Sequence, residues 1–182
     1  MRLMSTVRVM DRRLTKRMAS WQEPALHRTL SAVEEAAESS KLWCGAAAVM
    51  AWGGGGRGRK AAVAGLAALT LAQLVSNGVC KQVSNRPRPP EEWIPHDEVE
   101  DRPDSSSFPS GHTAAAVAFT AAVVPSWRAA GMACGVPAAL VAVERVQSGA
   151  HYPSDVAAGA AIGLLSAWLV RHLPQQALRM WR

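Results

Sequence analysis

Three short stretches of the chain carry residues of the types that bind and cleave a phosphate ester. They lie at 81–89, 109–112 and 145–155, each at the end of an apolar segment. Together they supply three permanent cations, two imidazoles, one carboxylate and a Ser-Gly pair that precedes an apolar helix. These groups suffice to hold a phosphoryl group and to transfer it to a histidine.

The first stretch contains a lysine and an arginine. Lys81 closes an apolar segment, and Arg88 follows seven residues later. Because Pro87 and Pro89 push the residues before them towards extended conformations, the predicted helix ends before Arg88. The planar arginine fork matches phosphate oxygens and lysine acts as a point charge, so both can approach one anion. Alone, the pair fits a basic membrane-edge anchor equally well.

The second stretch, Pro-Ser-Gly-His at 109–112, opens an apolar helix. Free N–H groups at a helix N-terminus form an anion site, and Gly111 lets the backbone approach the anion closely. His112 lies in the first turn, where it can protonate a leaving alkoxide. Ser110 alone would fit ordinary capping, but the combination with the other two stretches favours an anion site.

The third stretch predicts a nucleophile. Arg145 ends an apolar segment, His151 follows six residues later, and Pro153 begins the next helix, which brings Asp155 into its first turn. A carboxylate four residues after a histidine can accept a hydrogen bond from one ring nitrogen. The other nitrogen is then unprotonated and available to attack phosphorus.

The elements that position these stretches are predicted to be helices, so the fold class is all-α. At 182 residues the chain has room for one domain. Five apolar segments are predicted at about 42–56, 61–80, 111–126, 129–146 and 154–173. Each is slightly shorter than the ~20 residues of a spanning helix, so a soluble alanine-rich bundle is an alternative. The near absence of charge inside the segments favours a helical membrane bundle.

The flanking regions differ in composition from the bundle. Residues 1–41 form a basic amphipathic region with helical spacing from residue 11 and a predicted break at Pro24, and residues 42–182 form one helical membrane domain. Residues 53–60 predict a tight basic turn. The charged, proline-rich stretch 86–107 predicts a solvated loop beside the site, and its carboxylates match no metal-ligand spacing.

The order and spacing of the three stretches resemble the signature motifs of the type 2 phosphatidic acid phosphatase superfamily. That superfamily includes lipid phosphate phosphatases, bacterial acid phosphatases and vanadium-dependent haloperoxidases. The resemblance spans residues 81 to 155, with one departure, because Glu144 stands where the family pattern has serine. On a helix the Glu144 side chain points about 100° away from that of Arg145, so we expect it not to touch the phosphate.

The resemblance implies a metal-independent phosphatase that acts on a lipid phosphate monoester or a polyprenyl phosphate or diphosphate and needs no cofactor. It implies roles in catalysis for His151 as nucleophile, His112 as acid and Asp155 as the partner of the nucleophile. The implied phosphate-binding residues are Lys81, Arg88, Ser110, Gly111 and Arg145. A haloperoxidase-like enzyme that holds vanadate and a catalytically idle lipid- or phosphate-binding membrane protein are the alternatives.

Charge gives an expectation for location. The net charge of +6 suits anionic lipid surfaces and phosphate substrates, and we expect membrane lipids and no nucleic acid as partners. The helix ends opposite the motifs carry basic residues and no acids. The positive-inside tendency therefore predicts an extracytoplasmic site in the cell membrane. The N-terminal 41 residues, with eight Lys/Arg and five acids, oppose that orientation. The sequence leaves the oligomeric state open.

Overall fold

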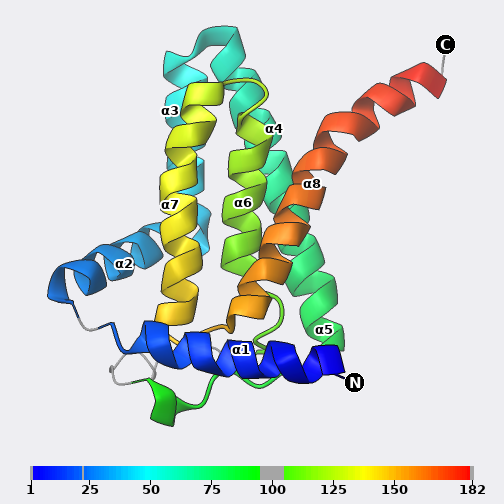
Figure 1. The fold of residues 1–182 in the computed structure, drawn as a ribbon. Helices are drawn as coiled ribbons and strands as arrows, with labels where there is room; N and C mark the ends of the chain where they lie inside the picture. Colours follow the sequence, from blue (N-terminus) through cyan, green and yellow to red (C-terminus); the bar gives the residue numbers. More distant parts are fainter. Residues whose placement is uncertain (1, 22, 95–104, 181–182) are drawn as a thin grey trace.

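The computed structural model describes residues 2–21, 23–94 and 105–180, and within those ranges it consists of helices and loops. The helices in chain order are α1 (Arg2–Ala19), α2 (Pro24–Ala37), α3 (Lys41–Gly53), α4 (Gly55–Gln73), α5 (Lys81–Val83), α6 (Gly111–Val123), α7 (Arg128–Gln147) and α8 (Pro153–Met180). Helices α3, α4, α6, α7 and α8 run roughly along one axis, and α1 lies crosswise at one end of them (Figure 1). The predicted all-α bundle is confirmed.

Each of the five predicted apolar segments forms a helix, but their lengths differ. A π-helical stretch, Leu74–Cys80, joins α4 to α5, so Gly55–Val83 is a continuous apolar helix of 29 residues. This helix, α7 and Pro153–Leu173 of α8 are long and apolar enough to cross a membrane. Helices α3 and α6 have 13 residues each, which is short for a span perpendicular to the bilayer.

The N-terminal region is more helical than the spacing from residue 11 predicts. Helix α1 already begins at Arg2, and Pro24 opens α2 instead of merely breaking a helix. Proline suits that first position because its missing N–H would have no intrahelical partner there. The predicted basic turn at 53–60 is also shorter than expected. Only Gly54 separates α3 from α4, and residues 57–60 lie inside α4.

Small residues allow the bundle helices to approach each other closely. Many buried core positions are alanines, and the large side chains Trp43 of α3 and Phe119 of α6 pack with ring centroids 5.3 Å apart. A Cβ on Gly159 would collide with the carbonyl oxygen of Ser110, and one on Gly163 with that of Ala114. Close glycine contacts of this kind are typical of membrane helix pairs, and they bring the start of α8 against the start of α6.

The helix ends that carry the motifs therefore meet at one end of the bundle. Helix α5 ends there, α6 and α8 begin there, and α7 ends there, with α1 running across all of them (Figure 1). The antiparallel arrangement of the apolar segments accounts for this convergence.

Candidate active site

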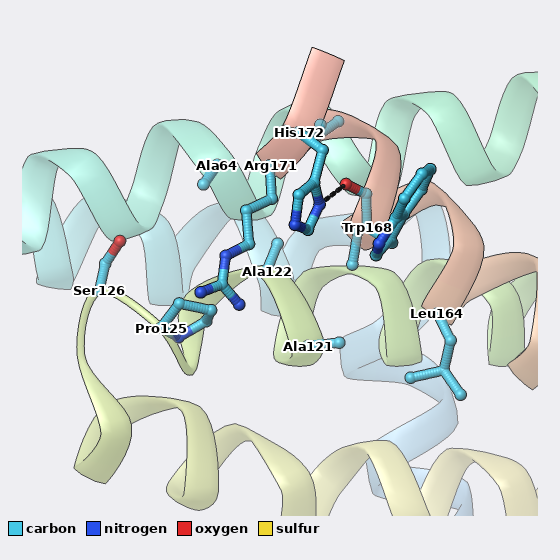
Figure 2. Close-up of a pocket in the computed structure, with 11 residues that line it drawn as sticks. Ala64, Ala121, Ala122, Pro125, Ser126, Leu164, Trp168, Arg171 and His172 are labelled. Atoms are coloured by element: carbon cyan, nitrogen blue, oxygen red, sulfur yellow. Dashed lines mark hydrogen bonds between the residues drawn. The ribbon is translucent and has the colours of Figure 1, made fainter. Parts of the chain in front are cut away.

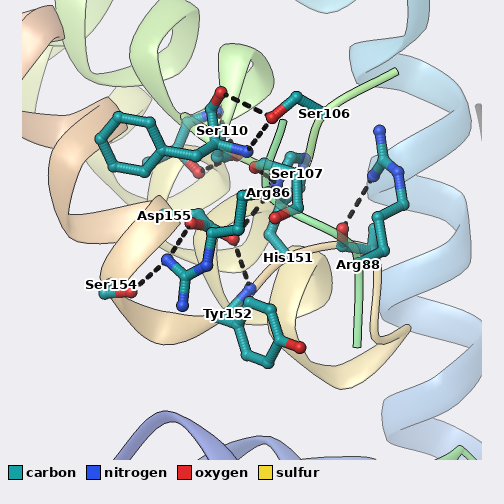
Figure 3. A network of polar contacts seen from close by, with 12 residues as sticks. Arg86, Arg88, Ser106, Ser107, Ser110, His151, Tyr152, Ser154 and Asp155 are labelled. Atoms are coloured by element: carbon teal, nitrogen blue, oxygen red, sulfur yellow. Dashed lines mark hydrogen bonds and ion pairs between the residues drawn. The ribbon is translucent and has the colours of Figure 1, made fainter. Parts of the chain in front are cut away.

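Hydrogen bonds join the three predicted motifs directly. An Arg88 Nη atom donates to the carbonyl oxygen of Ala150 at 2.7 Å, which ties the first motif to the third. The Ser110 N–H donates to the carbonyl oxygen of Asp155 at 3.1 Å, which ties the second motif to the third. The structure thus brings one or more residues of each motif together, and Figure 3 shows four of them: Arg88, Ser110, His151 and Asp155.

His151 is buried, with 2% of its surface exposed. Its Nδ1 atom lies 2.5 Å from the carbonyl oxygen of Ser107. Because a carbonyl oxygen only accepts, Nδ1 carries the proton and Nε2 has the free lone pair. The predicted acceptor, Asp155, is 4.0 Å from Nδ1, so in this structure the main chain and not the carboxylate fixes the tautomer.

The surroundings of His151 keep its ring neutral. Burial lowers the pKa of His151 well below its ordinary value, and the positive charges of Arg88, Arg145 and Lys81 lower it further, against the bond to Ser107. A cation beside three other cations in a buried site is unfavourable. Nucleophilic attack needs the unprotonated ring, so these cations favour the reactive form.

Asp155 is fully buried and binds groups on both of its oxygens. Its Oδ2 accepts from the N–H of Tyr152 at 2.9 Å, and its Oδ1 accepts from Nη1 of Arg86 at 2.5 Å. Arg86 also stacks over the ring of Tyr152, 4.3 Å from its centroid. Asp155 therefore orders the loop that carries His151 and holds a fourth cation at the edge of the site.

Arg86 belongs to the predicted solvated loop, and its contact with Asp155 is not indicated by the predicted motifs. The Arg86 guanidinium binds Asp155 and Ser154 (Figure 3). It also binds Asp11 of α1. Its carbonyl oxygen accepts from the N–H of Ser107 at 3.0 Å. A signal was available, because the dipeptide Arg86-Pro87 repeats the Arg-Pro of the first motif.

The second motif begins α6 as predicted. Ser110 caps the helix: its hydroxyl accepts from the N–H of Thr113 and lies 2.9 Å from the Thr113 hydroxyl. Since the Ser110 N–H is also engaged, the N–H groups of Gly111 and His112 in the first turn are the donors that we expect to reach an anion. A side chain at Gly111 would strike the Asn77 amide.

His112 is partly exposed in this first turn. Its ring lies within electrostatic reach of Arg145, Lys81, Arg88 and the carboxylate of Glu34. Lys81 follows the π-helical stretch at the end of the long apolar helix, and it is half-buried, as is Arg88. The three predicted phosphate cations and the predicted acid thus surround one region, with Glu34 of α2 as an additional member.

Arg145 is paired with two carboxylates. Its Nε donates to Glu144, and an Nη atom forms an ion pair with Glu34 of α2. The side chains of Glu144 and Arg145 leave the helix about 100° apart, but they are long enough to bend together. The expectation that Glu144 does not touch the phosphate stays a prediction. Glu144 is buried, with 1% of its surface exposed, whereas the Glu34 side chain is 38% exposed.

Glu34 was not predicted to belong to the site, because α2 shows only ordinary amphipathic spacing. Burial raises the pKa of Glu34, but the charge of Arg145 and its hydrogen bond outweigh that effect, and the pKa lies below its ordinary value. Glu34 is therefore ionised at neutral pH and occupies one Nη atom of Arg145.

The acid-rich part of the predicted solvated loop, 95–104, lies outside the described residues. In the described part of the chain, no group of three or more histidine, cysteine or acidic side chains is arranged to hold a metal ion.

A separate cavity of about 250 Å³ lies beside the C-terminal end of α6 and the middle of α8 (Figure 2). It is lined by Pro125 and Ser126 after α6 and by Trp168, Arg171 and His172 of α8. His172 stacks on Trp168. These residues lie several helical turns from His112 and Asp155, so this cavity is distinct from the motif cluster.

Comparisons with known proteins agree with this geometry. Residues 61–179 match the family model described as the PAP2 superfamily. The chain is 48% identical over 65 residues to a lipid A 1-phosphatase of Rhizobium johnstonii, covering 34% of this chain and 24% of that protein. It is 46% identical over 66 residues to the decaprenylphosphoryl-5-phosphoribose phosphatase of Mycobacterium tuberculosis, covering 35% of this chain and 34% of that protein. The matches thus span about a quarter to a third of these relatives.

Two solved structures share the fold. A transmembrane PAP2 type phosphatidylglycerolphosphate phosphatase from Bacillus subtilis superposes with a TM-score of 0.71 at 24% identity, over 94% of this chain and 87% of that one. LpxE of Aquifex aeolicus gives 0.69 at 22% identity, over 87% of this chain and 92% of that one.

Proposed function

The chain belongs to the PAP2 superfamily, and on that basis we propose that it is a lipid phosphate phosphatase that works through a phosphohistidine intermediate. One observation carries the proposal: a buried histidine, His151, has its Nδ1 proton held by Ser107 while three cations gather around it. That arrangement suits a neutral nucleophile attacking a dianion.

The first step is phosphoryl transfer to His151. Lys81, Arg88, Arg145 and the N–H groups of Gly111 and His112 bind the phosphoryl oxygens and stabilise their charge in the transition state. The Nε2 lone pair attacks phosphorus in line with the leaving oxygen, and the P–O bond breaks as the P–N bond forms. His112 acts as the imidazolium, a cationic form that the negative charge of the bound phosphoryl group favours, and it gives its proton to the departing alcohol or phosphate.

The second step regenerates the histidine. Water attacks the phosphorus of phosphohistidine, and His112, which lost its proton in the first step, now takes one from the water. The P–N bond breaks, its electron pair returns to Nε2, and inorganic phosphate leaves. Protein cations supply the charge stabilisation throughout, so we expect activity without a metal ion.

The substrate we propose is a lipid phosphate monoester or a polyprenyl phosphate or diphosphate. Three helices suited to spanning a membrane support a lipid substrate. The names of the relatives support it too, since they refer to lipid A and to a decaprenylphosphoryl sugar phosphate. We place the protein in the cell membrane with an extracytoplasmic site, by the positive-inside tendency.

The test is phosphate release by purified protein from a panel of lipid phosphates in excess EDTA, with His151→Ala as the control. We expect release from at least one lipid phosphate, inhibition by vanadate, and no release by the control. Activity that requires added magnesium, or that persists in His151→Ala, would contradict the proposed chemistry. Bromide oxidation by a vanadate-loaded protein without phosphatase activity would favour the haloperoxidase alternative.

A further inference from the structure

Helix α1 reaches the candidate site through one buried carboxylate. Asp11 has 3% of its surface exposed, although most of its neighbours on α1 are exposed. It is the sole acidic residue of a helix with six arginines and lysines. A buried carboxylate is unfavourable unless it is paired and hydrogen-bonded, so its partners indicate what it does.

The partners of Asp11 belong to the site. Its Oδ2 accepts from Nη2 of Arg86 at 2.7 Å and from the Ser154 hydroxyl at 2.7 Å, and its Oδ1 accepts from the Ser154 N–H at 3.0 Å. The other Arg86 nitrogen, Nη1, donates to Asp155. Arg86 thus bridges two carboxylates, one on α1 and one at the start of α8.

Arg86 is open to competition from a bound phosphate. Its side chain is 27% exposed, and it belongs to the same Arg-Pro segment as the phosphate ligand Arg88. An incoming dianion would attract this guanidinium away from Asp155. Asp11 binds the other guanidinium nitrogen, Nη2. This second carboxylate opposes that attraction and fixes the orientation of the Arg86 guanidinium.

We propose that Asp11 is a positioning residue for the nucleophile: it holds Arg86 on Asp155, so that the docking of α1 becomes a condition of phosphoryl transfer. This inference rests on the proposed function, because it concerns the same histidine. Arg86 acts on His151 through two connections. Its side chain holds Asp155, and its carbonyl oxygen holds the N–H of Ser107, whose own carbonyl oxygen binds the ring.

Two substitutions at Asp11 separate positioning by charge from packing. Asp11→Asn keeps the size of the side chain and removes its charge, whereas Asp11→Glu keeps the charge and adds a methylene to a buried site. Positioning through Arg86 predicts that Asp11→Asn is the more harmful change. A purely structural role predicts the reverse, because overpacking a buried site is the larger disturbance.

The split between kcat and KM gives an independent readout. The hydrogen bonds of Asp11 given above go to Arg86 and Ser154 and to none of the proposed phosphate ligands, and a released Arg86 would add a cation to the phosphate. We therefore expect Asp11→Asn to lower kcat by about tenfold or more, as loss of an outer partner does at metal-bound histidines, with KM unchanged or lower.

The pH profile gives a second readout. When Arg86 leaves Asp155, the carboxylate keeps the Tyr152 N–H but loses its cation. Its negative charge, 4.0 Å from His151 Nδ1, then raises the pKa of the ring. The cations Lys81, Arg88 and Arg145 remain in place in every variant. The acid limb of kcat/KM should therefore move to higher pH in Asp11→Asn and stay in place in Asp11→Glu.

The experiment measures phosphohistidine formation, kcat and KM in detergent for wild type, Asp11→Asn, Asp11→Glu and the control Arg13→Gln, an exposed position on the same helix. Rates are taken per folded molecule, with the folded fraction measured by size exclusion. Slower labelling in Asp11→Asn than in Asp11→Glu, with the control near wild type, supports the inference. Equal rates in Asp11→Asn and the control, or slower labelling in Asp11→Glu than in Asp11→Asn, overturn it. A wild type that forms no phosphohistidine contradicts the proposed function instead.

Discussion

The Nδ1 atom of His151 lies 2.5 Å from the carbonyl oxygen of Ser107. A main-chain carbonyl is an acceptor that no side-chain substitution removes, so the reactive tautomer of the ring does not depend on a carboxylate. In the serine protease triad, by contrast, replacing the aspartate with asparagine costs about 10⁴-fold because the tautomer becomes wrong.

We accordingly predict that Asp155→Asn is a partial defect. The ring keeps its orientation through Ser107, while the loop and Arg86 lose a charged partner, so kcat should fall by clearly less than ~10⁴-fold. Single-turnover labelling should still show phosphohistidine at a reduced rate. A complete loss equal to that of His151→Ala would mean that Asp155 takes over the Nδ1 proton during turnover.

The pH dependence follows from the cations around His151. Its pKa is lowered by burial and by Arg88, Arg145 and Lys81, so the ring stays neutral at pH values below its ordinary pKa of about 6.5. We predict that the ¹⁵N resonances of His151, assigned by comparison with His151→Ala, show no protonation between pH 8 and 6. Protonation centred at or above pH 6.5 would show that the cations do not act on the ring as the structure indicates.

The ion pair between Glu34 and Arg145 predicts competition with the substrate. Glu34→Gln removes a negative charge that occupies Arg145, so phosphate and vanadate should inhibit more tightly. Half-exposed pairs contribute up to about 1 kcal/mol, which corresponds to about fivefold in an inhibition constant. Exposed Glu35 on the same helix gives the matched control Glu35→Gln, for which no change is expected. Weaker inhibition in Glu34→Gln would instead mean that Glu34 orients Arg145 for binding.

Glu144 should be dispensable although it touches Arg145. In Glu144→Ser the residue of the family pattern is present, and Glu34 still pairs with Arg145, so kcat/KM should remain within a few-fold of wild type. Arg145→Ala removes a charge from the transition state and should lower kcat by about 10²–10³-fold. Similar large losses in the two variants would place Glu144 in the phosphate site itself.

The sequence predicts the positions of the motif residues in the fold where those positions depend on neighbouring residues in the chain. Proline positions end the helix before Arg88 and start another before Asp155, and the alternation of apolar segments brings the motif-bearing ends together. These features depend on residues close in the chain or on the pattern of the family, which is why His112, His151 and Asp155 were located correctly in the fold.

The contacts that sequence reasoning missed join residues far apart in the chain. Asp11 and Arg86 are 75 residues apart, and Glu34 reaches Arg145 from a helix whose spacing indicates only amphipathic character. The acceptor of His151 is a main-chain oxygen, which no residue type marks. The π-helical stretch before Lys81 likewise follows from packing in three dimensions and not from a local motif.

The most direct test of the account separates the two histidines. Protein is incubated with a substrate that carries labelled phosphate, quenched, and analysed for acid-labile, base-stable label. In His112→Ala the intermediate should form from a good leaving group such as p-nitrophenol and accumulate, because the base for its hydrolysis is missing. In His151→Ala no label should form with any substrate. Label that survives in His151→Ala would show that another residue makes the covalent bond, and the central assignment would be wrong.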